Sequence, residues 1–150
     1  MISNKTKYAL KAVLMLTGKY ASKEPVLIAE IAETASIPKK FLEAILLELK
    51  NKGFLQSKKG KGGGYLLARS PNQISFGEVI GIFESPFASL PCLDTKANQQ
   101  CAECKKGNVC GIQMVMSEVY RTTSSILNIT TFQDVWDRMQ NTSQENMYFI

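Results

Sequence analysis

The chain has 150 residues, of which 45% are hydrophobic and 21% charged. It is therefore long enough for one globular domain with a real core, and its composition excludes disordered and fibrous proteins. It contains no histidine, which excludes mechanisms that need an imidazole base and metal sites with histidine ligands. Residues 1–70 carry 13 basic and 5 acidic side chains, a surplus of +8, whereas residues 71–150 carry 5 and 8, a balance of −3. This asymmetry indicates a polyanion-binding module joined to a part with another role.

The cysteines and the lack of long apolar stretches bear on the compartment. No stretch approaches the roughly 18–20 apolar residues of a membrane helix. Two lysines interrupt the apolar run over residues 8–20, and no small-residue cleavage site follows it, so we expect no signal peptide and a cytoplasmic location. All four cysteines lie within nineteen residues, at Cys92, Cys101, Cys104 and Cys110. In a reducing compartment such a cluster is more typical of a metal or redox site than of a disulfide framework.

The first half of the chain predicts three helices. Apolar residues recur at helical spacing over residues 3–20, and a short helix is expected over residues 28–34. A third helix is predicted over residues 38–52, with Pro38 in its first position, where no amide hydrogen is needed. The stripe of this helix that is predicted to face the core comprises Phe41, Leu42, Ile45, Leu46 and Leu49.

A hairpin is predicted directly after these helices. Two short strands, residues 54–57 and 65–68, flank the glycine-rich stretch 58–64. Three helices followed by a hairpin are the layout of a winged helix-turn-helix, in which one helix enters the major groove of DNA and the hairpin, or wing, lies beside it. The sequence therefore predicts a mainly α fold with a small β-hairpin wing.

The second half predicts further helices around a long loop. Ser75 and Glu78 form a capping box for a helix that ends near residue 84. Residues 85–108 contain two prolines and three cysteines with little periodicity, and a loop of this length is usually functional. A long helix over residues 109–127 and a shorter terminal helix follow, and the polar tail over residues 141–150 is expected to be poorly ordered.

The long helix over residues 109–127 carries too few charges to be fully exposed. It packs either within its own chain or against a second copy, and twofold dimers usually read symmetric DNA sites. We accordingly divide the chain into a DNA-binding region (1–72), a linking helix with a cysteine-containing sensor loop (73–110), a dimerisation and terminal helix (111–140) and a tail (141–150).

The outward face of the third helix is the first candidate for DNA contact. Near its start it carries Lys39, Lys40, Glu43 and Ala44, which lie off the apolar stripe. Such residues are either an ordinary solvated surface or a face that reads base edges. Because a basic hairpin follows a helix-turn-helix here, we favour the DNA-reading face.

The wing is the second candidate. Lys58, Lys59 and Lys61 stand beside three consecutive glycines. A nucleotide-binding P-loop needs a Lys-Ser/Thr pair after the glycines, whereas Gly64 is followed by Tyr65, so that interpretation fails. A solvated hairpin end remains an alternative. A basic tip against the DNA backbone fits better, because glycine permits close approach and lysine neutralises phosphate.

The cysteine spacing Cys92-x8-Cys101-x2-Cys104-x5-Cys110 leaves several sites open. Thiolates from one loop can converge on an iron–sulfur cluster, or all four can hold a structural zinc. Cys101 and Cys104 would also suit a thiol–disulfide oxidoreductase, although that motif normally opens a helix in a βαβ fold, which is not predicted here. Free thiols or a redox switch are the remaining interpretation.

Several motifs together resemble a known family. They are Lys7-Tyr8-Ala9-Leu10-Lys11-Ala12, Glu30-Ile31-Ala32-Glu33, Phe41-Leu42-Glu43, Gly53-Phe54-Leu55, Gly60-Lys61-Gly62-Gly63-Gly64-Tyr65-Leu66-Leu67-Ala68 and Gly77-Glu78-Val79-Ile80. They resemble the Rrf-two family of bacterial transcriptional regulators, which includes iron–sulfur and nitric-oxide-responsive repressors. The resemblance covers about residues 1–136, and the wing motif combined with the later cysteine loop makes it specific.

The resemblance implies a winged-helix homodimer whose long helix forms most of the dimer contact. It also implies that three loop cysteines ligate an iron–sulfur cluster, 2Fe-2S or 4Fe-4S, whose oxidation, nitrosylation or loss changes DNA affinity. Cys92, Cys104 and Cys110 resemble the three ligands, and Cys101 is an additional, possible one.

The sequence departs from the family pattern at several positions. Gln113 stands where some relatives have a histidine ligand, and Ser36 replaces the glycine of the helix turn. Lys59 and Lys61 replace the usual arginine and proline of the wing. Because Lys40 and Ala44 also differ from the base-reading residues of the best-known iron–sulfur member, its operator sequence does not carry over.

We therefore expect a homodimeric, DNA-binding transcriptional regulator, a repressor and no enzyme, that reads a pseudo-palindromic operator in double-stranded DNA. Ser3, Lys5 and Lys7 are expected near the DNA backbone, in addition to the helix and wing residues. The sensor is expected to be an iron–sulfur cluster in the cysteine loop, with a structural zinc or a thiol switch as the alternative. A thiol–disulfide oxidoreductase is the remote alternative of another class.

Overall fold

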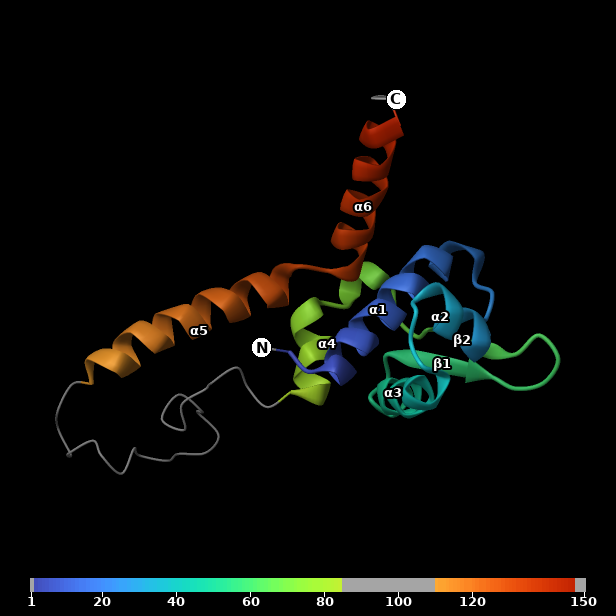
Figure 1. Cartoon of the computed structure of the whole chain (residues 1–150), viewed down its shortest axis with the longest axis horizontal. Coiled ribbons are helices and arrows are strands. Elements are labelled where there is room, and N and C mark those ends of the chain that lie inside the picture. The colour runs from blue at the N-terminus through green and yellow to red at the C-terminus, as the bar shows by residue number, and fades with distance from the viewer. Residues whose placement is uncertain (1, 85–109, 148–150) are drawn as a thin grey trace.

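Three helices and a hairpin follow one another in the predicted order in the computed structural model, which describes residues 2–84 and 110–147. The helices are α1 (Asn4–Lys19), α2 (Ile28–Thr34), α3 (Lys39–Asn51), α4 (Phe76–Phe83), α5 (Gly111–Ile129) and α6 (Phe132–Met147). The strands are β1 (Leu55–Lys58) and β2 (Gly64–Leu67), with short 3-10 turns η1 (Tyr20–Ser22) and η2 (Pro71–Gln73). Figure 1 shows α1 to α4 and the hairpin gathered in one body, from which α5 extends. No helix of the described part is both long and apolar enough to span a bilayer.

Helix α1 is central to this body and contacts α3, α4, α6 and β2. Its N-cap is Ser3, whose hydroxyl accepts a hydrogen bond from the Thr6 amide at 3.2 Å. Ala9 and Ala12 on its inward face are fully buried. Their small side chains let the neighbouring helices and the sheet approach α1 closely.

Helices α2 and α3 form the predicted helix-turn-helix. Ser36 in the turn adopts φ +52°, a left-handed conformation that glycine accommodates more readily than serine. Pro38 is the N-cap of α3 rather than its first residue, because its ψ of 125° is extended and its carbonyl accepts from the amides of Phe41 and Leu42. This predicted position was one residue too early.

The apolar stripe of α3 is confirmed at four of its five positions. Leu42, Ile45, Leu46 and Leu49 are at most 1% exposed, and burial of each stabilises the fold by roughly 1.5–3 kcal/mol. Phe41 is 62% exposed, so its predicted core position is wrong. Phe41 lies four residues before Ile45 and so fits the stripe by spacing, but no described element covers it in the first turn of α3.

The hairpin begins directly after α3. Gly53 ends the helix with two hydrogen bonds, Gly53 N–H to Lys50 O and Phe54 N–H to Leu49 O, both 2.9 Å long. The antiparallel register runs from the pair Leu55–Leu67 to the pair Lys58–Gly64. Both strands are thus close to their predicted positions, with the first beginning one residue later and the second one residue earlier.

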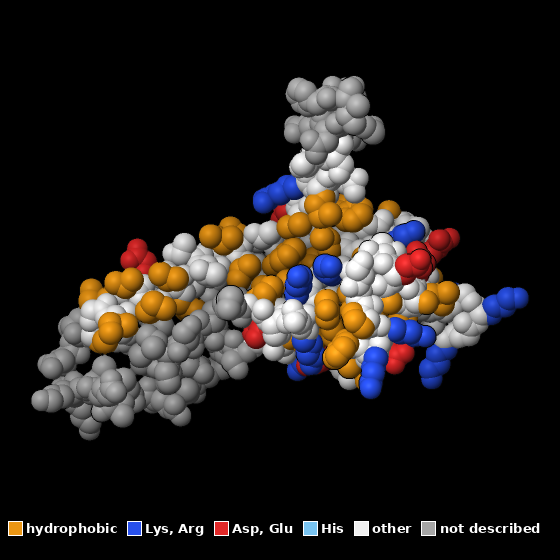
Figure 2. Space-filling model, in the orientation of Figure 1, with side chains coloured by type: hydrophobic (Ala, Val, Ile, Leu, Met, Phe, Trp, Pro, Cys, Tyr) orange, Lys and Arg blue, Asp and Glu red, His pale blue; other side chains and the backbone are white. Residues whose placement is uncertain are grey.

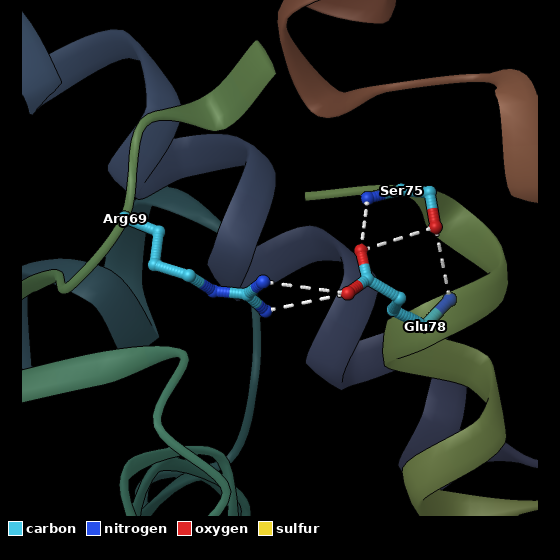
Figure 3. A network of polar contacts seen from close by, with 3 residues as sticks. All are labelled: Arg69, Ser75 and Glu78. Atoms are coloured by element: carbon cyan, nitrogen blue, oxygen red, sulfur yellow. Dashed lines mark hydrogen bonds and ion pairs between the residues drawn. The ribbon is translucent and has the colours of Figure 1, made fainter. Parts of the chain in front are cut away.

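The capping box of α4 is present in full. The Ser75 hydroxyl accepts from the Glu78 amide at 3.2 Å, and the Glu78 carboxylate accepts from the Ser75 amide at 2.8 Å (Figure 3). The other carboxylate oxygen lies 3.4 Å from the Arg69 guanidinium. That guanidinium also lies 4.5 Å from the centre of the Phe54 ring. Arg69 therefore links the base of the hairpin to the beginning of α4.

The junction between α5 and α6 is fixed against α4. The amide of Phe76 donates to Thr130 O, and the amide of Phe132 donates to Ile74 O, both at 3.0 Å. The rings of Phe76 and Phe132 stack with centroids 4.3 Å apart, and Phe132 is fully buried. This junction joins α5 and α6 to the body formed by α1 to α4 and the hairpin, which carries the predicted DNA contacts and is called the DNA-binding body below.

Helix α6 packs on α1 through Trp136. A Cβ built on Gly18 would overlap Cη2 of the Trp136 ring, so glycine alone fits at this contact. The helix continues to Met147, and the prediction of a poorly ordered tail from residue 141 is therefore wrong over residues 141–147. This stretch contains no glycine or proline, and Thr142 and Ser143 donate to carbonyl oxygens one turn earlier.

Candidate nucleic-acid interface

The outward face of α3 presents all four predicted base-reading residues to solvent. Lys39, Lys40, Glu43 and Ala44 are exposed on the side opposite the buried stripe. The apolar pattern determines this orientation, because the buried leucines and isoleucine leave one face of the helix open. A helix of this diameter fits the major groove, so its exposed N-terminal half is available to base edges.

Two exposed apolar residues of α3 were missed as members of this face. Leu47 is 52% exposed and follows Ala44 by three residues on the same outward side, while Phe41 lies on its flank. The spacing from Ala44 was a signal in the sequence that could have identified Leu47. Exposed apolar side chains on such a face can contact thymine methyl groups.

The wing holds its three lysines on a tight glycine turn. Gly60 and Gly62 have φ values of +91° and +78°, and a Cβ on Gly63 would overlap the carbonyl oxygen of Lys58. Lys58, at the end of β1, and Lys59 and Lys61, in the turn, are all exposed. Figure 1 shows this turn projecting from the body. Figure 2 shows Lys and Arg side chains along the same side of the molecule.

The remaining residues predicted to contact DNA lie at the N-terminus of α1, and they differ in whether they are already paired within the protein. Ser3 and Lys7 are exposed. The ammonium of Lys5 lies 2.5 Å from Oε2 of Glu48 in α3, an ion pair whose side chains are 50% and 35% exposed. It also lies 4.9 Å from the centre of the Phe83 ring. Lys5 is therefore already paired within the protein.

One carboxylate near this point has a strongly altered pKa. The Thr6 hydroxyl and the Ser3 backbone amide both donate to Oε1 of Glu84, the amide at 2.7 Å. These hydrogen bonds, that of Thr6 foremost, lower the pKa of Glu84 from 4.5 to about 2. Glu84 is therefore anionic at neutral pH and sits against the N-terminus of α1, where the helix dipole favours negative charge.

The predicted metal ligands fall mainly outside the described residues. Cys92, Cys101 and Cys104 lie there, and Cys110 is half-buried at the N-cap of α5. Within residues 2–84 and 110–147, no group of three or more histidine, cysteine or acidic side chains could hold a metal ion. The described residues therefore contribute at most one thiol to the predicted site.

Helix α5 presents an apolar face without cover from the described part of the chain. None of its residues is buried. Its large exposed side chains, which are 52–72% accessible, are Ile112, Met114, Val115, Val119, Ile126 and Ile129. Figure 2 shows hydrophobic side chains along the length of this helix. Exposed apolar surfaces of this extent are typical of interaction sites.

Comparison with known proteins identifies the family. A family model described as Rrf2, iron-dependent transcriptional regulator, matches residues 2–138. The chain belongs to the Rrf2 family. It is 38% identical over 137 residues to an Rrf2-like HTH-type transcriptional regulator of Rhodobacter capsulatus, covering 90% of this chain and 91% of the relative. It is 31% identical over 134 residues to the HTH-type transcriptional regulator NsrR of Bacillus licheniformis, covering 89% and 90%.

Two solved Rrf2 structures show the same fold. CymR, the global cysteine regulator of B. subtilis, matches with a TM-score of 0.76 at 24% identity, over 92% of this chain and 97% of CymR. IscR of T. potens matches with a TM-score of 0.76 at 23% identity, over 95% and 90%. The predicted mainly α winged-helix fold is thus confirmed. The chain is a DNA-binding transcriptional regulator, and the family assignment decides against the oxidoreductase alternative.

Proposed function

We propose that this Rrf2 regulator is a homodimeric repressor that reads a pseudo-palindromic operator in double-stranded DNA and senses its signal at the cysteines of residues 92–110. The observation that carries the DNA-reading part is the exposed face of α3 beside the lysine-bearing wing. Lys39, Lys40, Glu43 and Ala44 would contact base edges. A regulator that acts on the chromosome works in the bacterial cytoplasm.

The wing would supply contacts that do not depend on sequence. Lys58 at the end of β1 and Lys59 and Lys61 in the glycine turn are exposed, so their ammonium groups are accessible to a ligand. Lysines at such a tip neutralise phosphates, and each contact releases counterions. Ser3 and Lys7 at the start of α1 would add further contacts to the DNA backbone.

Dimerisation would use the apolar face of α5. Two antiparallel copies of this face can cover each other, and a twofold axis between them would present two copies of α3 to successive major grooves. The exposed Val119 lies near the middle of the helix, where such a contact would be centred. Because the α5–α6 junction is hydrogen-bonded to the start of α4, the arrangement of the two α5 helices would determine how the two DNA-binding bodies are oriented.

The sensor would be an iron–sulfur cluster held by cysteines. Cys110 fits one ligand position, because its half-buried side chain stands at the N-cap of α5 and cysteine thiolates are the ligands of such clusters. Cys92 and Cys104, with Cys101 as a possible fourth, would complete the set. When bound, the cluster supplies a group that oxidation or nitric oxide can alter.

The proposed DNA contacts are tested by selecting duplexes from a random library and measuring affinity against salt. We expect the affinity for the selected duplex to fall by about 10³ or more between about 50 and 200 mM salt, because several phosphates are neutralised. Replacement of Lys40 by Ala should change the selected sequence, whereas Arg138→Ala, an exposed basic residue of α6, should not. An affinity independent of salt would overturn the proposal.

The cluster is tested on protein purified without oxygen. Iron and sulfide in equal amounts, with a visible absorption spectrum that disappears in Cys110→Ser, would support it. A colourless protein with one tightly bound zinc per chain would replace the cluster by a structural zinc. A metal-free protein whose DNA affinity changes on thiol oxidation would favour a thiol switch instead.

A further inference from the structure

The last residues of α4 contact the first turn of α1. Oε1 of Glu84, the C-cap of α4, accepts hydrogen bonds from the Ser3 amide and the Thr6 hydroxyl. The preceding residue, Phe83, places its ring 4.9 Å from the ammonium of Lys5. Two consecutive residues at the end of α4 therefore hold three residues at the start of α1.

The same turn of α1 also contacts α3, the helix that is proposed to read the bases and is called the recognition helix below. The Lys5 ammonium lies 2.5 Å from Oε2 of Glu48 in α3. Glu48 follows Ala44 by four residues, so it lies one turn further along α3 on a neighbouring part of its surface. Lys5 is thus the group at which the end of α4, the start of α1 and the recognition helix meet.

We propose that Lys5 and Glu84 are positioning residues, which fix the recognition helix α3 relative to the end of α4, and that Lys5 acts through Glu48 rather than through a DNA phosphate. This inference rests on the proposed DNA-reading function. It replaces the sequence-based expectation that Lys5 contacts the DNA backbone. A lysine already paired at 2.5 Å would have to break its ion pair to reach a phosphate.

The size of the effect follows from the exposure of the pair. Both side chains are partly solvated, and exposed ion pairs contribute little to stability. We therefore expect little change in thermal stability when the pair is removed. The orientation of α3 matters more for base contacts than for folding, because small misplacements of contacting groups reduce specific binding sharply.

The first experiment is a double-mutant cycle with the full chain and its selected duplex. Lys5→Met and Glu48→Gln should each weaken binding about 5-fold, and the double variant should be no weaker than either single one. The slope of log affinity against log salt should stay unchanged in Lys5→Met. In Lys7→Met, an exposed lysine two residues further on, the slope should become shallower by about 0.9 if that lysine contacts a phosphate.

The opposite pattern would overturn the inference. If Lys5 contacts a phosphate, Lys5→Met lowers the salt slope by about 0.9, and its loss of affinity adds to that of Glu48→Gln. A wild-type chain that binds no selected duplex would instead remove the proposed function itself, together with this inference. The two failures are therefore distinguishable.

A second cycle tests the contact with α4. Glu84→Ala should weaken binding of the selected duplex about 3-fold to 10-fold in the wild-type background, and should have little effect when Lys5 is already Met. The matched control is Glu33→Ala, an exposed carboxylate of α2, which should leave affinity unchanged. An equal loss of affinity in both backgrounds would show that Glu84 acts independently of Lys5 and would overturn the linkage.

Discussion

Helices α3 and α5 are both amphipathic, but the apolar face of α3 is buried whereas that of α5 is exposed. The apolar stripe of α3 is buried under α1, α2 and β1, with four side chains at most 1% exposed. Six large apolar side chains of α5 remain 52–72% exposed. An apolar pattern therefore predicts that a helix face needs cover, but it does not say whether the same chain provides that cover. The described residues cover the apolar stripe of α3 but leave that of α5 exposed, and in the proposed dimer a second copy would cover it.

The largest effect is expected on the free energy of unfolding, for substitutions in the apolar stripe of α3, which the same chain covers. Replacement of the fully buried Leu46 by Ala should lower the free energy of unfolding by about 2–5 kcal/mol. Its neighbour Leu47 is 52% exposed, and Leu47→Ala should change that free energy by less than about 0.5 kcal/mol. Chemical denaturation of the two variants measures this contrast. Similar losses for both would mean that α3 is oriented differently in solution.

A somewhat smaller effect is expected on α5, where a second copy of the chain is proposed to supply the cover. Val119→Asp places a carboxylate in the middle of the proposed dimer contact and should weaken association by at least about 100-fold, roughly 2.7 kcal/mol. Light scattering should then give the mass of a monomer, while circular dichroism retains the helices. Glu118→Gln, on the same turn, is the matched control. A Val119→Asp variant that remains dimeric would place the contact elsewhere.

Substitutions in the wing should change DNA binding, whereas those in α3 and α5 change stability and association. Changing Lys59 and Lys61 together to Ala should weaken DNA binding and make the salt slope shallower by about 0.9 for each phosphate that is no longer neutralised. Mass and denaturation midpoint should not change, since both lysines are exposed. Fluorescence anisotropy of a labelled duplex measures the effect. An unchanged slope would identify the wing tip as a solvated turn.

The smallest effect is expected in acid. The lowered pKa of Glu84, about 2, means that its contribution to stability is present above its ordinary pKa of 4.5 and is lost as the pH falls towards 2. Thermal unfolding of the wild type should therefore lose more stability between about pH 5 and 2.5 than that of Glu84→Gln. Asp134, whose pKa is lowered by the Thr131 hydroxyl, contributes equally to both and cancels in the comparison. Parallel curves for the two proteins would contradict the assignment.

Local signals in the sequence predicted most of the fold. The Ser75–Glu78 capping box and Gly53 are short-range features, and they place the beginning of α4 and the end of α3 correctly. Phe41 was placed wrongly because its spacing fits the stripe, whereas its exposure depends on which elements surround the first turn of α3. The continuation of α6 to Met147 was missed because a polar composition is compatible both with disorder and with an exposed helix.

The candidate site was predictable where it depends on one helix or one turn. The exposure of Lys39, Lys40, Glu43 and Ala44 on α3 and of the wing lysines follows from periodicity and glycine placement, whereas their contact with bases and phosphates stays a proposal. The pairing of Lys5 with Glu48 joins residues 43 positions apart, and Glu84 reaches Ser3 across 81 positions. No spacing rule in a single sequence indicates contacts of that range. The arrangement of Cys92, Cys101 and Cys104 stays a prediction.

The contact between Gly18 and Trp136 has a consequence for DNA geometry. A methyl group added at Gly18 would displace the indole of Trp136. The angle between α6 and the DNA-binding body therefore depends on glycine at position 18. The α5–α6 junction is held against α4, so this angle also influences the direction in which α5 leaves the body. In the proposed dimer that direction determines the distance between the two recognition helices. In that dimer, the lack of a side chain at Gly18 would therefore help to set the spacing between the two half-sites of the operator.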